Sequence, residues 1–381
     1  MTALYHNARA VDASGIRDET WLLVEGDRIV RAGIGDGWRE HLVEASTVLD
    51  LADRLLVPGF IDLHCHGGGG HSFEDGGTSI RAALAAHRQH GTTRSVISLV
   101  ASPIPDTIAR LREIEQLAES DPLLLGAHLE GPFLEPSRRG AHAKKYLVAP
   151  DEEAVEALLR AAPVALTQVT IAPELSGAFD AIERFARAGV ISALGHTNAG
   201  YEIARLAFNQ GARILTHAFN AMPAIGHREP GPIVAAFDDT RVTLELIADG
   251  FHVRPEVVRL AFANAPGRIS LITDAMAGAG VGDGSYSLGD LEVEVKQGCA
   301  TVKDSNTLAG SVLTLDAALR GAVGAGVGLI EAVGALTVTP ARAIRRQSEL
   351  GLLAPGFFGD LVVLSNSLDV ERVMAAGKFL R

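Results

Sequence analysis

Apolar and amphipathic segments alternate over most of this chain. From about residue 55 onwards, eight apolar runs have the length of a β-strand. They cover residues 55–66, 93–100, 123–131, 164–172, 190–196, 212–217, 242–249 and 269–274. Between most of them lie segments such as SIRAALAAHRQHG and TIARLREIEQLAES, whose apolar residues recur at helical spacing. Eight strands that alternate with helices predict an α/β fold, the (β/α)8 TIM barrel.

A doubly wound open sheet is the alternative architecture. Its usual dinucleotide-binding signal is G-x-G-x-x-G after an early strand, and the chain lacks this motif. The glycine run at residues 67–70 does not match it, and no helix N-cap pattern follows directly. The barrel is therefore the favoured prediction.

Both ends of the chain have a different pattern from the middle. TWLLVEGDRIVRAG reads as two strands joined by a Gly-Asp turn, and the last thirty or so residues have the same character. We expect a small β-sandwich domain built from residues 1–54 and 355–381, and a catalytic barrel over residues 55–354. After the eighth strand, residues 280–310 interrupt the alternation, and they are expected to form a β excursion before the final helix.

Composition narrows the classes of function. The net charge of −12 argues against general nucleic-acid binding, which requires a basic face. Two cysteines, Cys65 and Cys299, cannot form a disulfide framework. The segment MTALYHNARAVDASG lacks the basic start and apolar core of a signal peptide, and no apolar run is long enough to span a bilayer. These features predict a cytoplasmic protein that binds neither nucleic acid nor membrane.

Metal-binding residue types stand where the predicted strands end. In a TIM barrel the active site forms at the carboxyl ends of the strands. The residues at these ends are His64, His66, Glu130, His196, His217 and Asp274. His64 and His66 occupy alternate positions of one strand and should point the same way, with Cys65 facing the helix layer. Imidazole nitrogens combined with carboxylate oxygens suit zinc or iron-type divalent ions, so we predict a metal site.

Several short motifs resemble one family. PGFIDLHCHG, HLEGPF, GHT, THAFNAM and TDAM are together similar to motifs of the amidohydrolase superfamily. GAH after HLEGPFLEPSRRG, then HREPG, ADGFH and TLAGS, resemble its N-acetylglucosamine-6-phosphate deacetylases. The motifs occur in the family's order and cover nearly the whole chain. The resemblance implies metal-dependent hydrolysis of the acetamide of N-acetylglucosamine 6-phosphate, in amino-sugar catabolism or cell-wall recycling.

The resemblance also implies roles for the metal-type residues. Glu130, His196 and His217 match ligands shared across the family, and His64 and His66 match a pair that supports a second metal in some members. One or two divalent ions per subunit are expected, with zinc preferred over iron, manganese or cobalt. Many amidohydrolases bridge two metals through a modified lysine on the fourth strand. VALTQVTIA contains no lysine, so any bridge must be Glu130.

Catalytic and substrate contacts follow from the same resemblance. Asp274 matches a metal-site residue that takes a proton from water and returns it to the leaving amine. His142 matches the group that holds the acetamide carbonyl or its oxyanion. The remaining substrate contacts implied are Asn220, Ala221, Arg228, His252 and Leu308. In the family the arginine comes from a partner subunit, so a homodimer is expected, in which Arg228 reaches the neighbouring active site.

Two other classes of function remain. The chain could be another amidohydrolase, a cyclic-amide hydrolase or a deaminase, although neither needs the implied phosphate contacts. It could also be a non-catalytic scaffold, although such proteins usually lose metal ligands. No role is assigned to the histidines at positions 71, 87, 90 and 227, which are interpreted as surface or loop residues.

Overall fold

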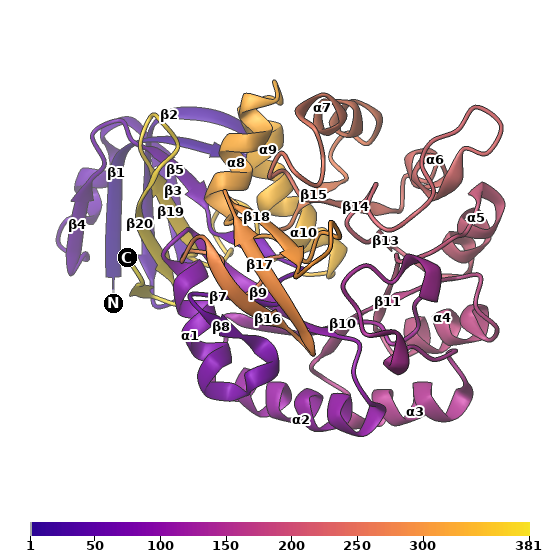
Figure 1. The fold of residues 1–381 in the computed structure, drawn as a ribbon. Helices are drawn as coiled ribbons and strands as arrows, with labels where there is room; N and C mark the ends of the chain where they lie inside the picture. Colours follow the sequence, from indigo (N-terminus) through magenta and orange to yellow (C-terminus); the bar gives the residue numbers. More distant parts are fainter. Residues whose placement is uncertain (1) are drawn as a thin grey trace.

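A computed structural model describes residues 2–381 and contains all eight predicted barrel strands (Figure 1). The strands pair in chain order, each parallel to the next. They are β6 (Phe60–Asp62), β9 (Thr92–Val100), β10 (Leu124–Glu130), β11 (Leu166–Ile171), β12 (Ile191–Leu194), β13 (Ile214–Leu215), β14 (Thr243–Leu246) and β15 (Ile269–Leu271). The TIM-barrel prediction is confirmed.

The barrel closes just beyond its first and last strands. Asp274 N–H donates to the carbonyl of His64 at 2.8 Å, and His66 N–H donates to the carbonyl of Ala275 at 2.7 Å. Cys65 and Ala275 form a parallel bridge between these bonds. The closing contacts therefore lie at the carboxyl rim, among the candidate metal ligands themselves.

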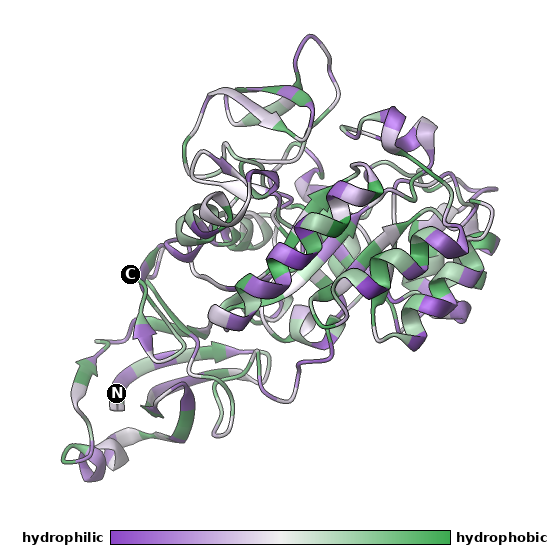
Figure 2. Cartoon of the chain, turned by 90° about the horizontal axis from the view of Figure 1, so that it is seen from below, coloured by the Kyte–Doolittle hydropathy of each residue, from purple (hydrophilic) through white to green (hydrophobic). Residues whose placement is uncertain are grey.

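A helix follows each barrel strand. These helices are α1 (Gly77–Arg88), α2 (Ile104–Ser120), α3 (Glu152–Ala161), α4 (Ala178–Arg187), α5 (Tyr201–Gln210), α6 (Gly231–Asp238), α7 (Pro255–Asn264) and α8 (Leu315–Gly324). In α4 the buried residues are Ala178, Ala181, Ile182 and Phe185, an i, i+3, i+4, i+7 stripe that faces the sheet. Figure 2 shows the resulting alternation of hydrophobic and hydrophilic bands along the outer helices. Two further helices, α9 (Leu329–Leu336) and α10 (Val338–Ala343), precede the C-terminal strands.

Both termini contribute to one separate sheet, as predicted. Its order is β21-β20-β19-β5-β1-β2-β3, and β4 pairs with β1. The bounds are β1 Thr2–Asp12, β2 Gly15–Glu25, β3 Arg28–Ile34, β4 Thr47–Asp50, β5 Leu55–Pro58, β19 Leu361–Leu364, β20 Val370–Ala375 and β21 Lys378–Phe379. One apolar cluster combines side chains from β1, β2, β3, β5, β19 and β20, so this sheet has a core of its own.

The single strand expected over residues 55–66 is in fact two strands. β5 pairs with β19 of the terminal sheet, whereas β6 pairs with β9 of the barrel. Gly59 lies between them, and a Cβ there would come within 2.2 Å of the Thr93 hydroxyl. The division into residues 1–54 with 355–381 and residues 55–354 stays a prediction, and β5 extends the terminal sheet across that boundary.

The glycine run forms a tight hairpin behind the histidine pair. β7 (Gly67–Gly68) pairs with β8 (His71–Ser72), and the two turn residues between them have φ of 60° and 85°. Positive φ at both turn positions fits a type I′ hairpin, which favours glycine. A Cβ at Gly67 would lie 2.4 Å from the His71 carbonyl oxygen, so the close backbone approach also requires glycine.

The predicted β excursion is a three-stranded antiparallel sheet beside the barrel mouth (Figure 1). It consists of β16 (Gly284–Leu288), β17 (Leu291–Lys296) and β18 (Cys299–Val302). Its buried side chains pack with Val100, Ala141 and Met276 from the barrel rim. The excursion therefore forms one wall above the carboxyl ends of the strands. None of the helices within residues 2–381 combines the length and the hydropathy that crossing a bilayer requires.

Candidate active site

Six side chains from five strand ends meet at the mouth of the barrel. His64 and His66 follow β6, Glu130 ends β10, and the other three residues follow β12, β13 and β15. His196, His217 and Asp274 have positive φ values of 46°, 27° and 48°. This left-handed conformation is uncommon for residues other than glycine and is concentrated at functional sites. It coincides here with the sharp turn that takes each strand into its loop.

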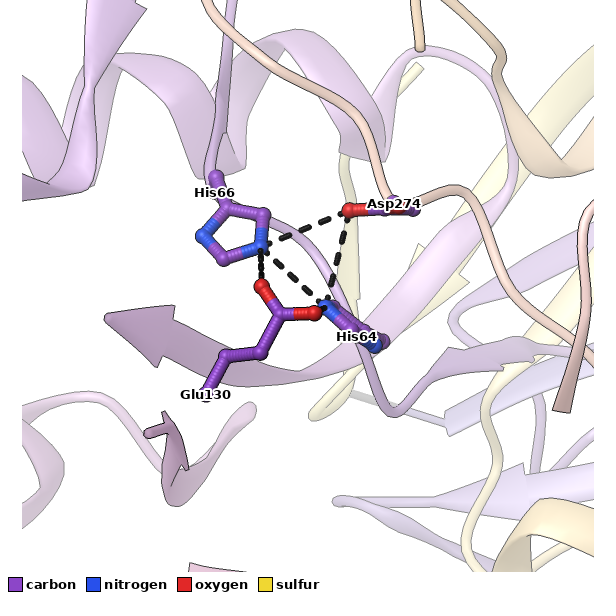
Figure 3. Close-up of side chains that lie close together, drawn as sticks. All are labelled: His64, His66, Glu130 and Asp274. Atoms are coloured by element: carbon purple, nitrogen blue, oxygen red, sulfur yellow. Dashed lines mark hydrogen bonds and ion pairs between the residues drawn. The ribbon is translucent and has the colours of Figure 1, made fainter. Parts of the chain in front are cut away.

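The first half of the cluster consists of His64, His66, Asp274 and Glu130 (Figure 3). The Nε2 atoms of His64 and His66 are 3.1 Å apart. His66 Nε2 lies 3.0 Å from Glu130 Oε2 and 3.4 Å from Asp274 Oδ1. His64 Nε2 lies 3.5 Å from both carboxylates. All four ligand atoms converge on one point between the strand ends.

The second half consists of His196, His217 and the same Glu130. The Nε2 atoms of the two histidines are 3.0 Å apart, and each lies 3.0 Å from Glu130 Oε1. Glu130 Oε1 thus lies near His196, His217 and His64, and Oε2 lies near His66, so this one carboxylate contacts both histidine pairs. This is the position of a bridging carboxylate, on a barrel whose β11 contains no lysine.

The donor set fits a divalent metal. Zinc binds histidine and carboxylate at roughly 2.0–2.2 Å in tetrahedral geometry, which places neighbouring ligand atoms about 3.3–3.6 Å apart. The ligand–ligand distances in the two halves, from 3.0 to 3.5 Å, are close to that spacing. Nitrogen and oxygen donors without sulfur also suit iron, manganese or cobalt, so the donors by themselves leave the metal open.

Two backbone or side-chain acceptors orient these histidines from behind. His64 Nδ1 donates to Glu245 Oε2 at 3.3 Å, and His196 Nδ1 donates to the Arg138 carbonyl at 2.7 Å. Each contact leaves the Nε2 lone pair directed at the cluster, as in other carboxylate–histidine–metal arrangements. Glu245 also accepts from Gln168 Nε2 at 2.9 Å and is fully buried.

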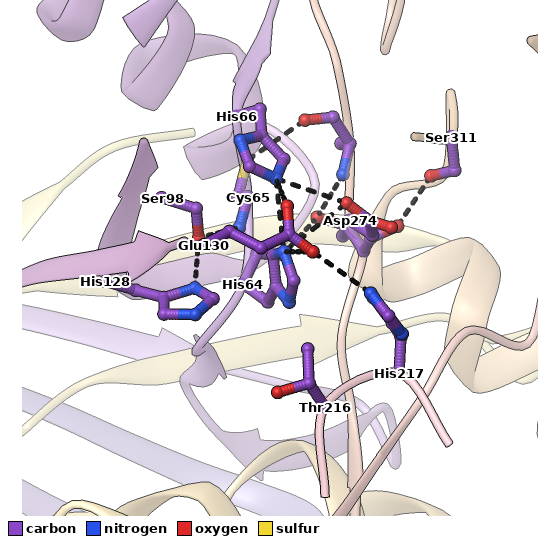
Figure 4. Close-up of polar contacts among 12 residues, drawn as sticks. His64, Cys65, His66, Ser98, His128, Glu130, Thr216, His217, Asp274 and Ser311 are labelled. Carbon is purple, nitrogen blue, oxygen red and sulfur yellow. Dashed lines mark hydrogen bonds and ion pairs between the residues drawn. The ribbon is translucent and has the colours of Figure 1, made fainter. Parts of the chain in front are cut away.

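Sequence analysis missed Glu245 and His128. Glu245 interrupts the apolar run of β14, and an acidic residue in a strand buried on both faces is a signal of a buried polar contact. His128 lies two residues before Glu130, is fully buried and packs edge-on against His64 (Figure 4). Its ring contacts the hydroxyls of Ser98 and Thr170 at 2.9 and 2.8 Å. Burial, reinforced by the charge of His64, holds its pKa well below the usual range, so it packs as a neutral ring.

Charges inside the cluster oppose the effect of burial. Burial by itself raises the pKa of Asp274, but the charge of His64 and the hydrogen bond from His66 lower it to about 2. Burial lowers the pKa of His66, but its bonds to Asp274 and Glu130 raise it to about 10. The carboxylates are thus ionised at neutral pH and stabilise cationic partners, whether these are protons on histidine or a metal ion.

His142 is held as a hydrogen-bond donor toward the pocket. Its Nδ1 accepts the backbone N–H of Ala101 at 3.2 Å, so the proton of the neutral ring is on Nε2. Nε2 lies 3.2 Å from Glu130 Oε2. Burial lowers the pKa of this histidine despite the opposing charge of Glu130, which favours the neutral donor.

A pocket of about 440 Å³ opens above the cluster. Its lining includes the predicted substrate residues Asn220, Ala221, His252 and Leu308, together with His142. His252 Nδ1 donates to Asp249 Oδ2 at 2.7 Å, and this carboxylate raises the pKa of the histidine against the effect of burial. Arg228 is exposed and is not among the lining residues of its own chain.

One of the histidines left without a role, His87, differs from the surface or loop interpretation. His87 is 2% exposed on α1, in the buried stripe with Ile80, Ala83 and Leu84. It donates from Nε2 to the Gly67 carbonyl at 2.8 Å and lies 3.3 Å from the Cys65 thiol, which faces the helix layer as expected. His90 contacts the buried Asp316 at 3.2 Å. His71 and His227 are exposed, as predicted.

Comparisons with known proteins agree with this geometry. Residues 55–380 match the group described as the Amidohydrolase family. An N-acetylgalactosamine-6-phosphate deacetylase of Escherichia coli O157:H7 is 36% identical over 330 residues, which are 85% of this chain and 87% of the relative. An N-acetylglucosamine-6-phosphate deacetylase of Vibrio furnissii is 33% identical over 336 residues, 85% of this chain and 82% of its own.

A solved structure extends the similarity to the whole fold. A mutant of the Mycobacterium smegmatis N-acetyl-D-glucosamine-6-phosphate deacetylase, in complex with N-acetyl-D-glucosamine-6-phosphate, is 39% identical. It superimposes with a TM-score of 0.93 over 100% of this chain and 99% of that one. The chain is thus a member of the amidohydrolase family, and the relatives it matches over most of its length are deacetylases of N-acetylated amino-sugar 6-phosphates.

Proposed function

We propose that the protein hydrolyses the acetamide of N-acetyl-D-glucosamine 6-phosphate, releasing acetate and glucosamine 6-phosphate. The observation that carries this proposal is Glu130, whose carboxylate contacts both histidine pairs at the floor of a pocket. Family membership supplies the reaction class, and the named relatives supply the substrate class. The reaction would serve amino-sugar catabolism or cell-wall recycling.

The metal-type residues are proposed to hold one or two divalent ions, zinc by preference. His64, His66, Asp274 and Glu130 would form one position, and Glu130, His196 and His217 the other. A divalent cation there supplies Lewis-acid polarisation and lowers the pKa of nearby water. Glu130 is the only side chain placed to serve both positions among those described in residues 2–381.

Asp274 is proposed as the general base and then the general acid. Its lowered pKa keeps the carboxylate ionised at neutral pH, ready to accept a proton from the attacking water at Oδ1. Water adds to the acetamide carbonyl carbon, and the same proton then passes to the sugar nitrogen as the C–N bond breaks. A hydrogen-bonded base at the rim of the pocket has the position that both transfers need.

His142 is proposed to hold the carbonyl oxygen. Its proton is on Nε2 because Nδ1 accepts the Ala101 amide, and this N–H lies 3.2 Å from Glu130 Oε2 in the lining of the pocket. A neutral donor preorganised toward developing negative charge stabilises the oxyanion more than the ground state. Leu308 lines the same pocket and is proposed to contact the acetyl methyl group.

The sugar phosphate is proposed to lie between two subunits of a homodimer. His252, Asn220 and Ala221 line the pocket on one chain, and the raised pKa of His252 favours the imidazolium form that suits a phosphate. Arg228 has no ion-pair partner among the described residues and lies outside its own pocket. It would reach the neighbour's phosphate with its bidentate guanidinium.

The proposal includes a cytoplasmic location. Cys65 and Cys299 are both free thiols, which suits a reducing compartment. The alternatives fit less well. A cyclic-amide hydrolase or deaminase leaves His252 and its neighbours unused, and a non-catalytic scaffold leaves the whole convergent cluster without a purpose.

The sugar epimer defines a second candidate. The E. coli relative named above is an N-acetylgalactosamine-6-phosphate deacetylase, and it is as similar in sequence as the glucosamine enzymes. The test is a comparison of kcat/KM for the gluco and galacto 6-phosphates and for unphosphorylated N-acetylglucosamine. The proposal expects the gluco 6-phosphate to be preferred. Preference for the galacto epimer would favour the second candidate, and equal rates without phosphate would refute both.

A further inference from the structure

A second charged cavity lies at the opposite end of the barrel from the active site. Its volume is about 170 Å³. Five arginines line it, namely Arg213, Arg241, Arg268, Arg342 and Arg345. Arg213 and Arg268 stand immediately before β13 and β15, and Arg241 lies two residues before β14, at the amino ends of adjacent parallel strands. The other two come from α10, which packs against β15, and from the residues that follow it (Figure 1).

Five arginines around one cavity contrast with the net negative charge of the chain. The sequence has 46 acidic and 34 basic residues, so cations elsewhere are outnumbered by carboxylates. Of the five guanidinium groups, only Arg241 has an ion-pair partner within the described part of the chain. That partner is Asp239, at 2.6 Å. The other four guanidinium groups around this small cavity have no ion pair among residues 2–381, and Asp239 attracts Arg213 and Arg268 only at longer range.

Neutral carbonyl groups fix two of these arginines in place. Arg268 donates from Nη1 to the carbonyls of Ala236, Asp239 and Val242 at 2.7 to 3.0 Å. Arg213 donates from Nη1 to Phe208 and Ala212 at 2.8 and 2.7 Å. These bonds hold the side chains but cancel no charge. Arg268 also donates from Nη2 to the carbonyls of Phe237 and Asn264, so within residues 2–381 only its Nε–H is left without an acceptor. Arg213 keeps its Nη2 and Nε donors for a further acceptor.

The positive charges of the arginines that line the cavity repel one another. Burial lowers the pKa of Arg213, and the charges of Arg241 and Arg345 lower it further against the attraction of Asp239. Burial likewise lowers the pKa of Arg268. An anion in the cavity would relieve this repulsion, whereas the surrounding backbone cannot.

We propose that this arginine cavity binds a phosphate group, as inorganic phosphate or as part of a small phosphorylated metabolite, at a site separate from the active site. A guanidinium group binds two phosphate oxygens at once through parallel N–H donors, which makes arginine well suited to phosphate recognition. Pockets for drug-sized ligands have volumes of about 300–1,000 Å³, so a cavity of about 170 Å³ suits a phosphate group rather than a whole larger ligand. The inference is independent of the proposed deacetylase function.

The test is isothermal titration of the full-length protein with inorganic phosphate and, separately, with glucosamine 6-phosphate. The test variant is Arg342→Gln combined with Arg345→Gln, because these exposed residues make at most one hydrogen bond to the described chain. Arg346→Gln is the control, since it removes one positive charge next to the cavity, at a side chain that pairs with Glu349 and does not line the cavity. His252→Ala removes the proposed phosphate contact in the active site, so it distinguishes binding there from binding in the arginine cavity.

The expected result is phosphate binding that weakens at least about tenfold in the double variant, the scale of one lost charged hydrogen bond. It should persist in Arg346→Gln and in His252→Ala. If both probes bind in a way that depends on Arg342 and Arg345, the ligand is the phosphate group itself. If only glucosamine 6-phosphate shows this dependence, the ligand is a sugar phosphate. Binding that is unchanged in the double variant, or lost entirely in His252→Ala, overturns the proposal, as does the absence of arginine-dependent binding by either probe.

Discussion

The two halves of the candidate metal site are held in different ways. His64 and His66 follow one strand, are almost completely buried, and flank the backbone bonds that close the barrel. His196 and His217 follow two separate strands and adopt left-handed backbone conformations. Glu245 accepts from His64 Nδ1 and from the backbone N–H of His217, whereas His196 donates to the loop carbonyl of Arg138. The comparison indicates that Glu130, which contacts both, joins two ligands from a single strand end to two ligands from separate strand ends.

The largest effect is expected for Asp274→Asn, in the half of the site that contains His64 and His66. The amide cannot accept the proton, while it keeps the size of the side chain. We expect the variant to fold and bind metal but to lose about 10²–10⁴-fold in kcat, the usual contribution of a general acid–base group. Steady-state kinetics and metal analysis of the same preparation measure both. A kcat near that of the wild type would remove Asp274 from the role of base.

Alanine variants of the four histidines test the separation of the halves. His196→Ala or His217→Ala should abolish tight metal binding, whereas His64→Ala or His66→Ala should remove one equivalent of two. The reason is that His196 and His217 form one metal position with Glu130 Oε1. His64 and His66 belong to the other metal position. Metal per chain after dialysis is the readout. Equal loss in all four variants would show that the halves are not separable.

Arg228→Ala tests whether the pocket is completed by a partner. Loss of a charged hydrogen bond to phosphate costs about 1.5–3 kcal/mol, so KM for the phosphorylated sugar should rise about 10- to 100-fold. The slow reaction of the unphosphorylated sugar should hardly change. Mixing Arg228→Ala with Asp274→Asn chains should restore one good site per heterodimer. A mixed dimer that forms without regaining activity at low substrate would refute the cross-subunit contact.

The smallest effect is expected for Glu245→Gln behind His64. Glutamine can still accept the bond from His64 Nδ1 but loses the charge that orients the ring. Contacts of this kind typically contribute about 10- to 100-fold to metal affinity, and keeping an acceptor should limit the loss to about tenfold. Competition with a chelator measures it. Glu371→Gln, a change at an exposed ion pair with Arg54, is the control and should leave the affinity unchanged.

Proton release on metal binding provides a further test of the half that contains His64 and His66. Without metal, the raised pKa of His66, about 10, means that this histidine holds a proton at pH 7 that the metal must displace. Metal affinity should therefore increase as pH rises toward 10, and binding should release protons. Titrations at pH 7 in buffers of different ionisation enthalpy detect that release. Buffer-independent heats would contradict a protonated His66.

The barrel could be predicted from the sequence because its strands are buried on both faces. All nine residues of β9 are buried, for example, and its second half, VISLV, is apolar except for one serine. The break at Gly59 could not be predicted in this way. β5 and β6 are equally apolar, and only their pairing with different sheets separates them.

The site was predictable to the extent that it depends on residue type at strand ends. His64, His66, Glu130, His196, His217 and Asp274 follow from that rule and from the family resemblance. The Arg138 contact to His196 uses a backbone carbonyl, which no residue type reveals. His87 could have been placed better, since positions 80, 83, 84 and 87 form one apolar helical stripe.

Acetate release from N-acetyl-D-glucosamine 6-phosphate, measured before and after metal removal, tests the central claim most directly. The account predicts that the protein treated with a chelator is inactive, that zinc restores turnover, and that Asp274→Asn stays inactive in the same assay. Full turnover without metal, or no acetate from the zinc-loaded protein, would contradict it.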